Sequence, residues 1–395
     1  MLLGLVGKPS AGKSTFFKAC TLANAAVAAY PFTTIKPNRG IGYVKIKCID
    51  EEFNVQCNPR EGYCLNHWRF VPVQILDVAG LVPGAHQGKG LGNQFLDDLR
   101  QADAFLHVVD LSGTSDSEGK PTENHDVRKD ISFLEEELDL WFLGIMEKVW
   151  RSFSRKTSSE KVPLHEAIVK QFSGLNIKEK EVKEAILKSG LNAGKVDRWN
   201  REDLLRFVKL LRKLSKPSII IANKCDHPKA EENLKIIKER FPDLIIIPCS
   251  AEAELVLREA SKEKLIEYIP GEDHFEIINE AKLNEKQLKA LKFIDEKVLK
   301  VYGSSGVQNV LNKVLFDLLH YIAVFPAGAH KLADSKGNIL PDCFLVPNGT
   351  TALEFAYRIH SDLGNNFVKA INAKTKQVVG KDYILKNRDG IEIVT

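Results

Sequence analysis

A glycine-rich loop directly after the first apolar run is the feature that most constrains this chain. Residues 7 to 14 fit the pattern G-x-x-x-x-G-K-[ST] at every fixed position, and the run Leu2–Val6 before them predicts a buried strand. The glycines let the backbone wrap a phosphate chain with its N–H groups turned inward, and the helix expected after the loop adds the positive end of its dipole. The pattern predicts a nucleoside triphosphate site in which Lys13 reaches the β- and γ-phosphates and Ser14 ligates Mg²⁺. The residues expected to contact the nucleotide here are Gly7, Lys8, Pro9, Ser10, Ala11, Gly12, Lys13, Ser14 and Thr15.

A second phosphate motif follows the apolar run Val71–Leu76. Asp77 stands at the end of this expected strand, in a position to hold Mg²⁺ through a water molecule. Gly80, three residues further on, offers a backbone N–H to the γ-phosphate, so this loop is expected to sense whether that phosphate is present. The motif D-x-x-G is weak by itself, but its position behind the phosphate loop makes it a strong signal.

Two further loops predict that the base is guanine. The sequence N-K-C-D at residues 223 to 226 follows a β-rich run, and the Asp226 carboxylate can accept hydrogen bonds from both the N1–H and the exocyclic amine of guanine. A Ser-Ala pair follows the apolar run 245–247 and is placed to contact the base oxygen. All these motifs end expected strands, where open α/β sheets bind ligands, so the predicted substrate is GTP. The residues expected to bind it from these two loops are Asn223, Lys224, Asp226, Ser250 and Ala251.

A segment that closes over the γ-phosphate is expected between the first two motifs. Tyr30-Pro-Phe-Thr-Thr34 lies there, and such switch segments usually supply a threonine to Mg²⁺. Thr34 is the expected ligand and Thr33 is the alternative. The predicted Mg²⁺ site therefore consists of Ser14, Thr34 and, through water, Asp77.

The composition is that of a globular protein of two or three domains. The chain has 395 residues, of which 44% are hydrophobic and 27% charged. No apolar stretch approaches the roughly 20 residues of a membrane span, and Met1 leads straight into the first expected strand, so we expect neither a signal peptide nor a membrane partner. The seven cysteines include no C-x-x-C pair, so we expect reduced thiols and a cytoplasmic protein.

Four residues with metal-ligand chemistry, Cys48, Cys57, Cys64 and His67, lie close together in the sequence. The gaps of nine and seven residues between the cysteines do not fit the usual knuckles of two to four residues. The sequence leaves open whether the group binds a metal. Its spacing favours reduced thiols in or near a hairpin.

Charge is unevenly distributed, although the net charge is only +4. Acidic residues dominate between residues 124 and 147, whereas residues 148–216 hold 18 Lys and Arg against 8 Asp and Glu. A solvated helical face and a patch for RNA or the ribosome both remain open as explanations. The basic segment 148–216 is the predicted site for a ribosome or RNA partner.

A helical insertion is predicted before the guanine motif, because Asp77 and Asn223 are 146 positions apart. Apolar residues recur there at steps of three and four, which predicts two long helices packed as a hairpin with two shorter helices between them. The shorter helices are expected near Leu164–Phe172 and Lys180–Lys188. The two apolar stripes are Ile131, Leu134, Leu138, Phe142, Ile145 and Val149, and then Leu204, Leu205, Val208, Leu211 and Leu214.

The last third of the chain predicts helices followed by a small β-rich unit. The helices are expected at Asn284–Tyr302 and Val307–Tyr321, broken at Gly303–Gly306. A hairpin, a helix from about residue 352 to His360 and two closing strands then have the order of a β-grasp. The predicted organisation is a nucleotide-binding domain at 1–270 with an insertion at about 120–216, a helical linker region at 271–320 and a β-grasp domain at 321–395.

Taken together, these motifs resemble the Obg family of translation-factor GTPases. The resemblance rests on Tyr30-Pro-Phe-Thr-Thr34, on Asp77-Val-Ala-Gly-Leu-Val-Pro-Gly-Ala-His86 and on the glycine-rich continuation from Gly88 to Asp103. It is closest to the YchF-like branch and its archaeal relatives, and the C-terminal unit resembles a TGS domain, chiefly in Pro347-Asn-Gly-Thr-Thr351. The resemblance implies an α/β fold, namely a P-loop NTPase G domain with a mostly parallel sheet and flanking helices, a helical insertion and a regulatory or RNA-contacting TGS-like β-grasp domain.

Two departures from the family pattern affect the expected choice of nucleotide and the expected response to potassium. The YchF branch often has a degenerate guanine motif that admits ATP, whereas this chain has the intact N-K-C-D. Many potassium-stimulated relatives have asparagine where this chain has Ser10, so we expect no potassium activation.

Hydrolysis of GTP to GDP and phosphate is expected to be slow. Leu81 stands where Ras-like enzymes have a water-orienting glutamine, and the resemblance implies that a hydrophobic residue there is normal for the family. The candidates for a catalytic substitute are His86, Gln87, Lys89 or a group from a protein partner. The predicted function is a GTPase switch acting on the ribosome or RNA. The alternative is a GTP- or ATP-dependent stress regulator that acts through proteins.

Overall fold

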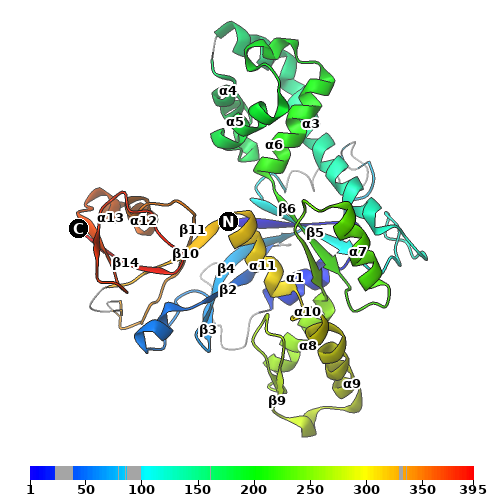
Figure 1. The fold of residues 1–395 in the computed structure, drawn as a ribbon, viewed down its shortest axis with the longest axis vertical. Coiled ribbons are helices and arrows are strands. Elements are labelled where there is room, and N and C mark those ends of the chain that lie inside the picture. Colours follow the sequence, from blue (N-terminus) through cyan, green and yellow to red (C-terminus); the bar gives the residue numbers. More distant parts are fainter. Residues whose placement is uncertain are drawn as a thin grey trace.

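A mostly parallel sheet forms the centre of the molecule, with helices on both of its faces (Figure 1). The computed structural model describes residues 1–22, 39–78, 80–84, 86, 99–160, 162–328, 332–334 and 336–395. Among these residues the sheet has seven strands in the order β2-β4-β1-β5-β6-β7, with β3 paired to β4. The strands are β1 (Leu2–Val6), β2 (Arg39–Lys47), β3 (Tyr63–Leu65), β4 (Trp68–Asp77), β5 (Ala104–Asp110), β6 (Ser218–Asn223) and β7 (Ile246–Cys249).

The direction of the strands brings the predicted motifs to one edge. Strands β4, β1, β5, β6 and β7 run parallel, whereas β2 and β3 pair with β4 antiparallel. Asp77 and Asn223 end β4 and β6, and the phosphate loop follows β1. The predicted parallel sheet is confirmed, and it gathers these loops because parallel strands end on the same side. The helices around it are α1 (Lys13–Thr21), α7 (Ala230–Arg240) and α8 (Ala251–Lys262).

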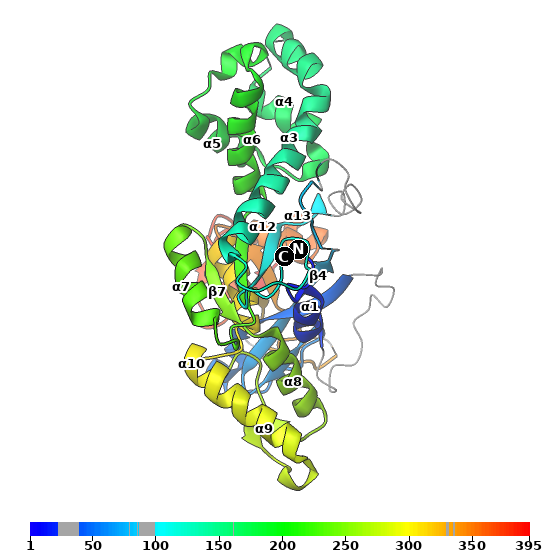
Figure 2. The ribbon, with the colours of Figure 1, turned by 90° about the vertical axis from the view of Figure 1, so that its right-hand side faces the viewer.

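The helical insertion extends from one end of the sheet, and Figure 2 shows α9 (Glu285–Ile294) at the opposite end. The predicted hairpin of two long helices with two shorter ones between them is confirmed. The long helix α3 packs against α6, and Trp150 stacks on Trp199 with ring centroids 5.7 Å apart. The four helices are α3 (Val127–Glu160), α4 (Leu164–Gln171), α5 (Glu179–Ser189) and α6 (Arg201–Ser215).

Two basic residues of the 148–216 segment are internal, which the sequence did not indicate. Arg212 is 1% exposed and donates to Glu135 and Asp139 of α3 at 2.6 and 2.8 Å. Lys216 is fully buried and donates to the backbone oxygens of Arg100 and Ala102. Arg212 joins α6 to α3, and Lys216 joins the end of α6 to residues 100–102, so neither side chain is available to an external partner.

The segment after α8 packs on the central sheet. It contains β8 (Ile266–Glu267), β9 (Glu276–Ile277), a π-helical turn at Asp295–Leu299, α10 (Lys300–Tyr302), α11 (Val307–Lys313) and a second π-helical turn at Val314–Leu318. The apolar side of α11 shares a hydrophobic core with β1 and α1. The prediction that this helix extends to Tyr321 was wrong, because Tyr321 begins β10 and pairs with Pro347. Sheet pairing, which is a tertiary interaction, decides where this helix ends.

The C-terminal domain has the predicted order of strands around one helix. Among the described residues its sheet has five strands in the order β11-β10-β14-β12-β13, and Thr351 caps α12 by accepting from the backbone N–H of Glu354. The predicted β-grasp arrangement is confirmed, with β13 and α13 as additional elements. The elements are β10 (Tyr321–Pro326), β11 (Phe344–Pro347), α12 (Ala352–Ile359), α13 (Ser361–Asn365), β12 (Lys369–Asn372), β13 (Val378–Val379) and β14 (Asp389–Val394).

Across the described parts of the chain, none of the helices has the length and apolar character needed to cross a membrane.

Candidate nucleotide-binding site

The phosphate loop joins β1 to α1 in a conformation that requires its glycines. Gly7 and Gly12 have φ angles of 145° and 96°. A Cβ on Gly7 would lie 2.5 Å from the Val108 carbonyl oxygen, and one on Gly12 would lie 2.2 Å from Nδ2 of Asn223. Both positions therefore combine a left-handed backbone with a close neighbour, which only glycine tolerates.

Lys13 is directed back onto its own loop. Its ammonium donates to the Lys8 carbonyl oxygen at 2.7 Å. The residue as a whole is 7% exposed. Burial lowers the pKa of Lys13 to about 8, although nearby Asp77 opposes this shift. Lys13 has no carboxylate at hydrogen-bond distance in the described parts of the chain, and such a buried lysine is suited to bind an anion such as a phosphate.

The side chains expected at Mg²⁺ lie together. The Ser14 hydroxyl donates to Oδ2 of Asp77 at 3.2 Å. The other oxygen, Oδ1 of Asp77, is buried and has no hydrogen-bond partner among the described residues. Burial raises the pKa of Asp77, against the effects of Ser14 and Lys13. An orphaned carboxylate oxygen beside a hydroxyl fits the oxygen chemistry of Mg²⁺. The expected third ligand, Thr34, and its alternative Thr33 lie outside the described residues.

The loop after Asp77 packs directly on the phosphate loop. The backbone N–H of Leu81 donates to the Gly7 carbonyl at 3.1 Å, and a Cβ on Gly80 would lie 2.8 Å from the backbone nitrogen of Pro9. The Leu81 side chain is 1% exposed and belongs to the core beneath α3. The residue that replaces the Ras-type glutamine is thus a core residue in this structure.

Asn223 joins the two ends of the predicted site. Its amide donates to the Ala11 carbonyl at 2.9 Å, and its oxygen accepts from the backbone N–H of Ala251 at 3.1 Å. Ser250 caps α8 by accepting from the backbone N–H of Ala253. In this arrangement the Ala251 N–H donates to Asn223, so the contact of Ala251 with a base oxygen stays a prediction.

The other two residues of the guanine motif that are expected to bind the base, Lys224 and Asp226, differ in their surroundings. Lys224, with a φ of 61°, donates from its ammonium to Oδ2 of Asp110 at 2.7 Å. Asp226 is half-buried and forms no hydrogen bond or ion pair with any residue that the structure describes. Its carboxylate is therefore free to accept hydrogen bonds from a ligand.

Two side chains of the phosphate loop point away from the predicted phosphates. Lys8 is 1% exposed, pairs with Asp130 of α3 at 2.8 Å and donates to the Ser115 carbonyl at 2.6 Å. The Ser10 hydroxyl donates to the Gly119 carbonyl at 3.2 Å. The expected nucleotide contacts of Lys8 and Ser10 would therefore come from their backbones, because the Lys8 side chain is bonded to Asp130 and Ser115 and the Ser10 side chain to Gly119.

His86 is held by the insertion. Its Nδ1 lies 2.7 Å from Oε2 of Glu137, which also accepts from the His86 backbone N–H at 2.9 Å. The other Glu137 oxygen accepts from the Gly84 backbone N–H at 2.6 Å. Glu137 of α3 thus fixes the loop that follows D-x-x-G, and a catalytic role for His86 stays a prediction. Gln87 and Lys89 lie outside the described residues.

These contacts of α3 could not be predicted from the sequence pattern. Asp130 and Glu137 stand in an acidic run whose spacing resembles an ordinary solvated helix. In the structure Asp130 contacts the phosphate loop, and Glu137 contacts the loop that follows D-x-x-G at Gly84 and His86, which we call the second switch loop. One helix therefore connects both predicted phosphate-sensing loops to the helical insertion.

Replacement of Glu137 by alanine is expected to accelerate amide exchange at Gly84 and His86 by about 10- to 100-fold. The reason is that a hydrogen bond to a charged group contributes about 1.5–3 kcal/mol. Hydrogen–deuterium exchange of the full chain measures this directly. Glu136→Ala is the matched control, because Glu136 is exposed on the same helix. Equal exchange in the two variants would contradict the assigned role of Glu137.

Three family models match separate parts of the chain. The model described as "50S ribosome-binding GTPase" covers residues 2–142, and "Obg-like GTPase YGR210-like, G4 motif-containing domain" covers residues 221–328. The model described as "TGS domain" covers residues 330–395.

Similar proteins align over most or all of their length. An uncharacterised GTP-binding protein of Methanocaldococcus jannaschii is 50% identical, with 100% of this chain and 99% of that protein covered. A protein of Bacillus subtilis named ribosome-binding ATPase YchF is 30% identical, with 93% of this chain and 87% of that protein covered. The crystal structure of a GTP-binding protein from Pyrococcus horikoshii matches with a TM-score of 0.80 and 39% identity over 100% of both chains. The chain therefore belongs to the Obg-like family of P-loop GTPases, in its YchF-related branch with archaeal members and a C-terminal TGS domain.

Proposed function

We propose that this protein is a slow GTPase switch that acts on the ribosome. The observation that carries the guanine assignment is the Asp226 carboxylate, which has no partner among the described residues, in a site where Asn223 joins the guanine motif to the phosphate loop. The nucleotide-binding residues are those predicted from the sequence, with Lys8 and Ser10 contributing through the backbone. Mg²⁺ would be held by Ser14, by Thr34 and, through water, by Asp77, and it would neutralise charge that develops on the phosphates.

GTP is favoured over ATP by the chemistry of the base site. Some relatives that are 27–30% identical are named ATPases, whereas the relative at 50% identity is named a GTP-binding protein. A carboxylate accepts hydrogen bonds from the two N–H donors of guanine. With adenine it would instead face the acceptor N1. Asp226 thus provides both attraction to guanine and rejection of adenine.

Slow hydrolysis follows from the position of Leu81. Its side chain is buried in the core and cannot hydrogen-bond water, so the chain lacks the usual orienting group at this position. His86, engaged with Glu137 in this structure, or a residue of a partner would supply that function. A partner that releases His86 from Glu137 would then accelerate hydrolysis.

The output of the switch is proposed to pass through α3. The first turns of this 34-residue helix contact the phosphate loop through Asp130 and the second switch loop through Glu137. Its far end forms the helical insertion with α6. A change in the loops on loss of the γ-phosphate would therefore bias the position of the insertion.

The ribosome is the proposed partner, and the basic helices of the insertion are the proposed contact. Relatives at 27–30% identity are named ribosome-binding. Exposed basic residues line α3 at Lys148, Arg151 and Arg155 and α6 at Arg206, Lys209 and Lys213. Such residues bind phosphate backbones with an affinity that falls as salt rises. The proposed domain limits are those predicted from the sequence, and the proposed location is the cytoplasm.

Reversal of charge on α6 is expected to weaken ribosome binding by tenfold or more at about 100 mM salt. The variant Arg206→Glu/Lys209→Glu/Lys213→Glu removes three exposed cations and adds three anions, which repel phosphates. Co-sedimentation of the full chain with ribosomes, in the presence of a non-hydrolysable GTP analogue, measures the effect over several salt concentrations. The control Lys286→Glu/Lys289→Glu/Lys292→Glu makes the same charge change on exposed positions of α9. If the wild-type chain fails to co-sediment even at low salt, the partner is not the ribosome, and a regulator acting through proteins is the better assignment.

A further inference from the structure

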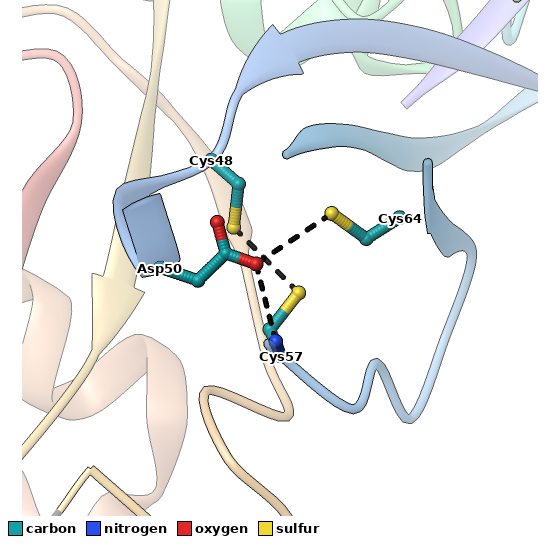
Figure 3. Close-up of side chains that lie close together, drawn as sticks. All are labelled: Cys48, Asp50, Cys57 and Cys64. Carbon is teal, nitrogen blue, oxygen red and sulfur yellow. Dashed lines mark hydrogen bonds between the residues drawn. The ribbon is translucent and has the colours of Figure 1, made fainter. Parts of the chain in front are cut away.

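Three cysteines and an aspartate that are spread over 17 residues of sequence meet at one point (Figure 3). Cys48 follows β2, Asp50 lies in the short helix Ile49–Phe53, Cys57 lies in the following loop and Cys64 lies in β3. Their potential ligand atoms all lie within 4.8 Å of one another. Cys48, Asp50 and Cys57 are buried and Cys64 is half-buried.

Two of the distances between the ligand atoms agree with those of a tetrahedral thiolate site. Zinc–sulfur bonds of about 2.3 Å at tetrahedral angles separate the sulfurs by roughly 3.8 Å. The Sγ atoms of Cys48 and Cys57 are 3.7 Å apart, and Sγ of Cys64 lies 3.8 Å from Oδ2 of Asp50. We propose that Cys48, Cys57, Cys64 and Asp50 form a structural site for a tetrahedral, thiolate-binding divalent metal ion, of which zinc is the fitting member. Three thiolates select zinc over Mg²⁺ or Ca²⁺, which prefer oxygen ligands.

The surroundings orient the donor set and balance its charge. Oδ1 of Asp50 lies 3.0 Å from Nδ1 of His67, and Oδ2 accepts from the Cys57 backbone N–H at 3.1 Å. His67 thus positions the carboxylate, as partners of metal-binding carboxylates commonly do. The guanidinium of Arg69, 1% exposed, lies with Nη1 3.6 Å from Sγ of Cys57. Three thiolates and one carboxylate around a divalent ion carry a net charge of −2, which the Arg69 cation partly offsets.

This site would fix the surface on which the C-terminal domain docks. The loop between Cys57 and Cys64 contacts that domain through two backbone bonds, from Asn58 to Ile339 at 2.8 Å and from Arg60 to Pro341 at 2.9 Å. Arg69 also donates to the backbone oxygens of Leu340 and Pro341. The loop has little regular structure, so the metal would hold it in its docking conformation. Loss of the metal is therefore expected to loosen the contact between the two domains.

The test starts with the metal content of the full-length chain purified from zinc-containing medium without a metal-chelating affinity step. We expect about one zinc per chain, and zinc-edge X-ray absorption should show three sulfurs at about 2.3 Å and an oxygen at about 2.0 Å. Replacement by Co²⁺ should give the visible bands of tetrahedral cobalt and the near-ultraviolet thiolate-to-cobalt charge transfer. These measurements use the wild-type chain, so they do not depend on a variant that fails to fold.

Variants then assign the ligands. Cys57→Ser should lose the zinc or bind it at least about tenfold more weakly, whereas Cys343→Ser, a change at a half-buried cysteine outside the cluster, should retain it. Removal of the zinc with a chelator should accelerate amide exchange in residues 54–62 and 336–342. The proposal is overturned if the wild-type chain neither contains nor takes up zinc or cobalt. A Cys48–Cys57 disulfide in the freshly purified chain, or equal zinc in both variants, would also overturn it.

Discussion

The variant Asp226→Asn is expected to lose GTP affinity by at least about 100-fold and to gain affinity for xanthosine triphosphate. The Asp226 carboxylate accepts two hydrogen bonds from guanine in the proposed site, and an asparagine amide would face the guanine amine with its own N–H donors. Xanthine has an oxygen in place of that amine. The asparagine side chain can donate to this oxygen and accept from N1–H, so the change exchanges one base preference for another.

Titration calorimetry or a fluorescent nucleotide competition assay with GTP, xanthosine triphosphate and ATP measures this exchange. Asp243→Asn is the matched control, since Asp243 is exposed and lies outside the guanine motif. ATP affinity should change little in either variant. Unchanged GTP affinity in Asp226→Asn would show that the base is read elsewhere, and the guanine assignment would be wrong.

The second large effect is expected from the ion pair under the phosphate loop. Lys8→Met should lower the free energy of unfolding by about 3–5 kcal/mol, because it leaves Asp130 buried without its cationic partner. Lys8 and Asp130 are 1% and 2% exposed, and burial raises the pKa of Asp130 even with Lys8 beside it. The remaining neighbour is His125, whose Nε2 lies 2.7 Å from Oδ1 of Asp130.

Urea unfolding followed by tryptophan fluorescence measures this loss. The double variant Lys8→Met/Asp130→Leu should recover most of the stability, because it removes both charges from the interior. Lys313→Met is the control, since the Lys313–Asp317 pair lies at the surface and should contribute less than about 1 kcal/mol. Similar losses for Lys8→Met and Lys313→Met would mean that the pair under the phosphate loop has little energetic weight.

The parts of the fold that the sequence predicted are those set by local patterns. The apolar run before Gly7 and the helical period of α3 and α6 each specify an element through contacts between near neighbours in the sequence. The nucleotide motifs are of the same kind, because they follow strands whose parallel direction brings their ends together. The end of the helix before Tyr321 was missed, because pairing with a distant strand decided it.

The site was predicted as a set of loops, and the structure adds what connects them. Lys8 belongs to the phosphate motif, yet its side chain binds Asp130, 122 positions further along the chain. No local pattern distinguishes Asp130 and Glu137 from the other acids of α3. Only the packing of that helix against the sheet shows which of them face the nucleotide loops.

The sequence by itself determined the fold class and the order of the nucleotide motifs, because both follow from local periodicity and from residues at strand ends. The tertiary structure decided how the loops are joined to α3. It also decided that Cys48, Cys57 and Cys64, whose spacing fits no compact metal motif, meet around Asp50. The physical reason is that ligand geometry depends on distances in space, and a chain that folds back on itself brings the Sγ atoms of Cys48 and Cys57, nine residues apart, to 3.7 Å.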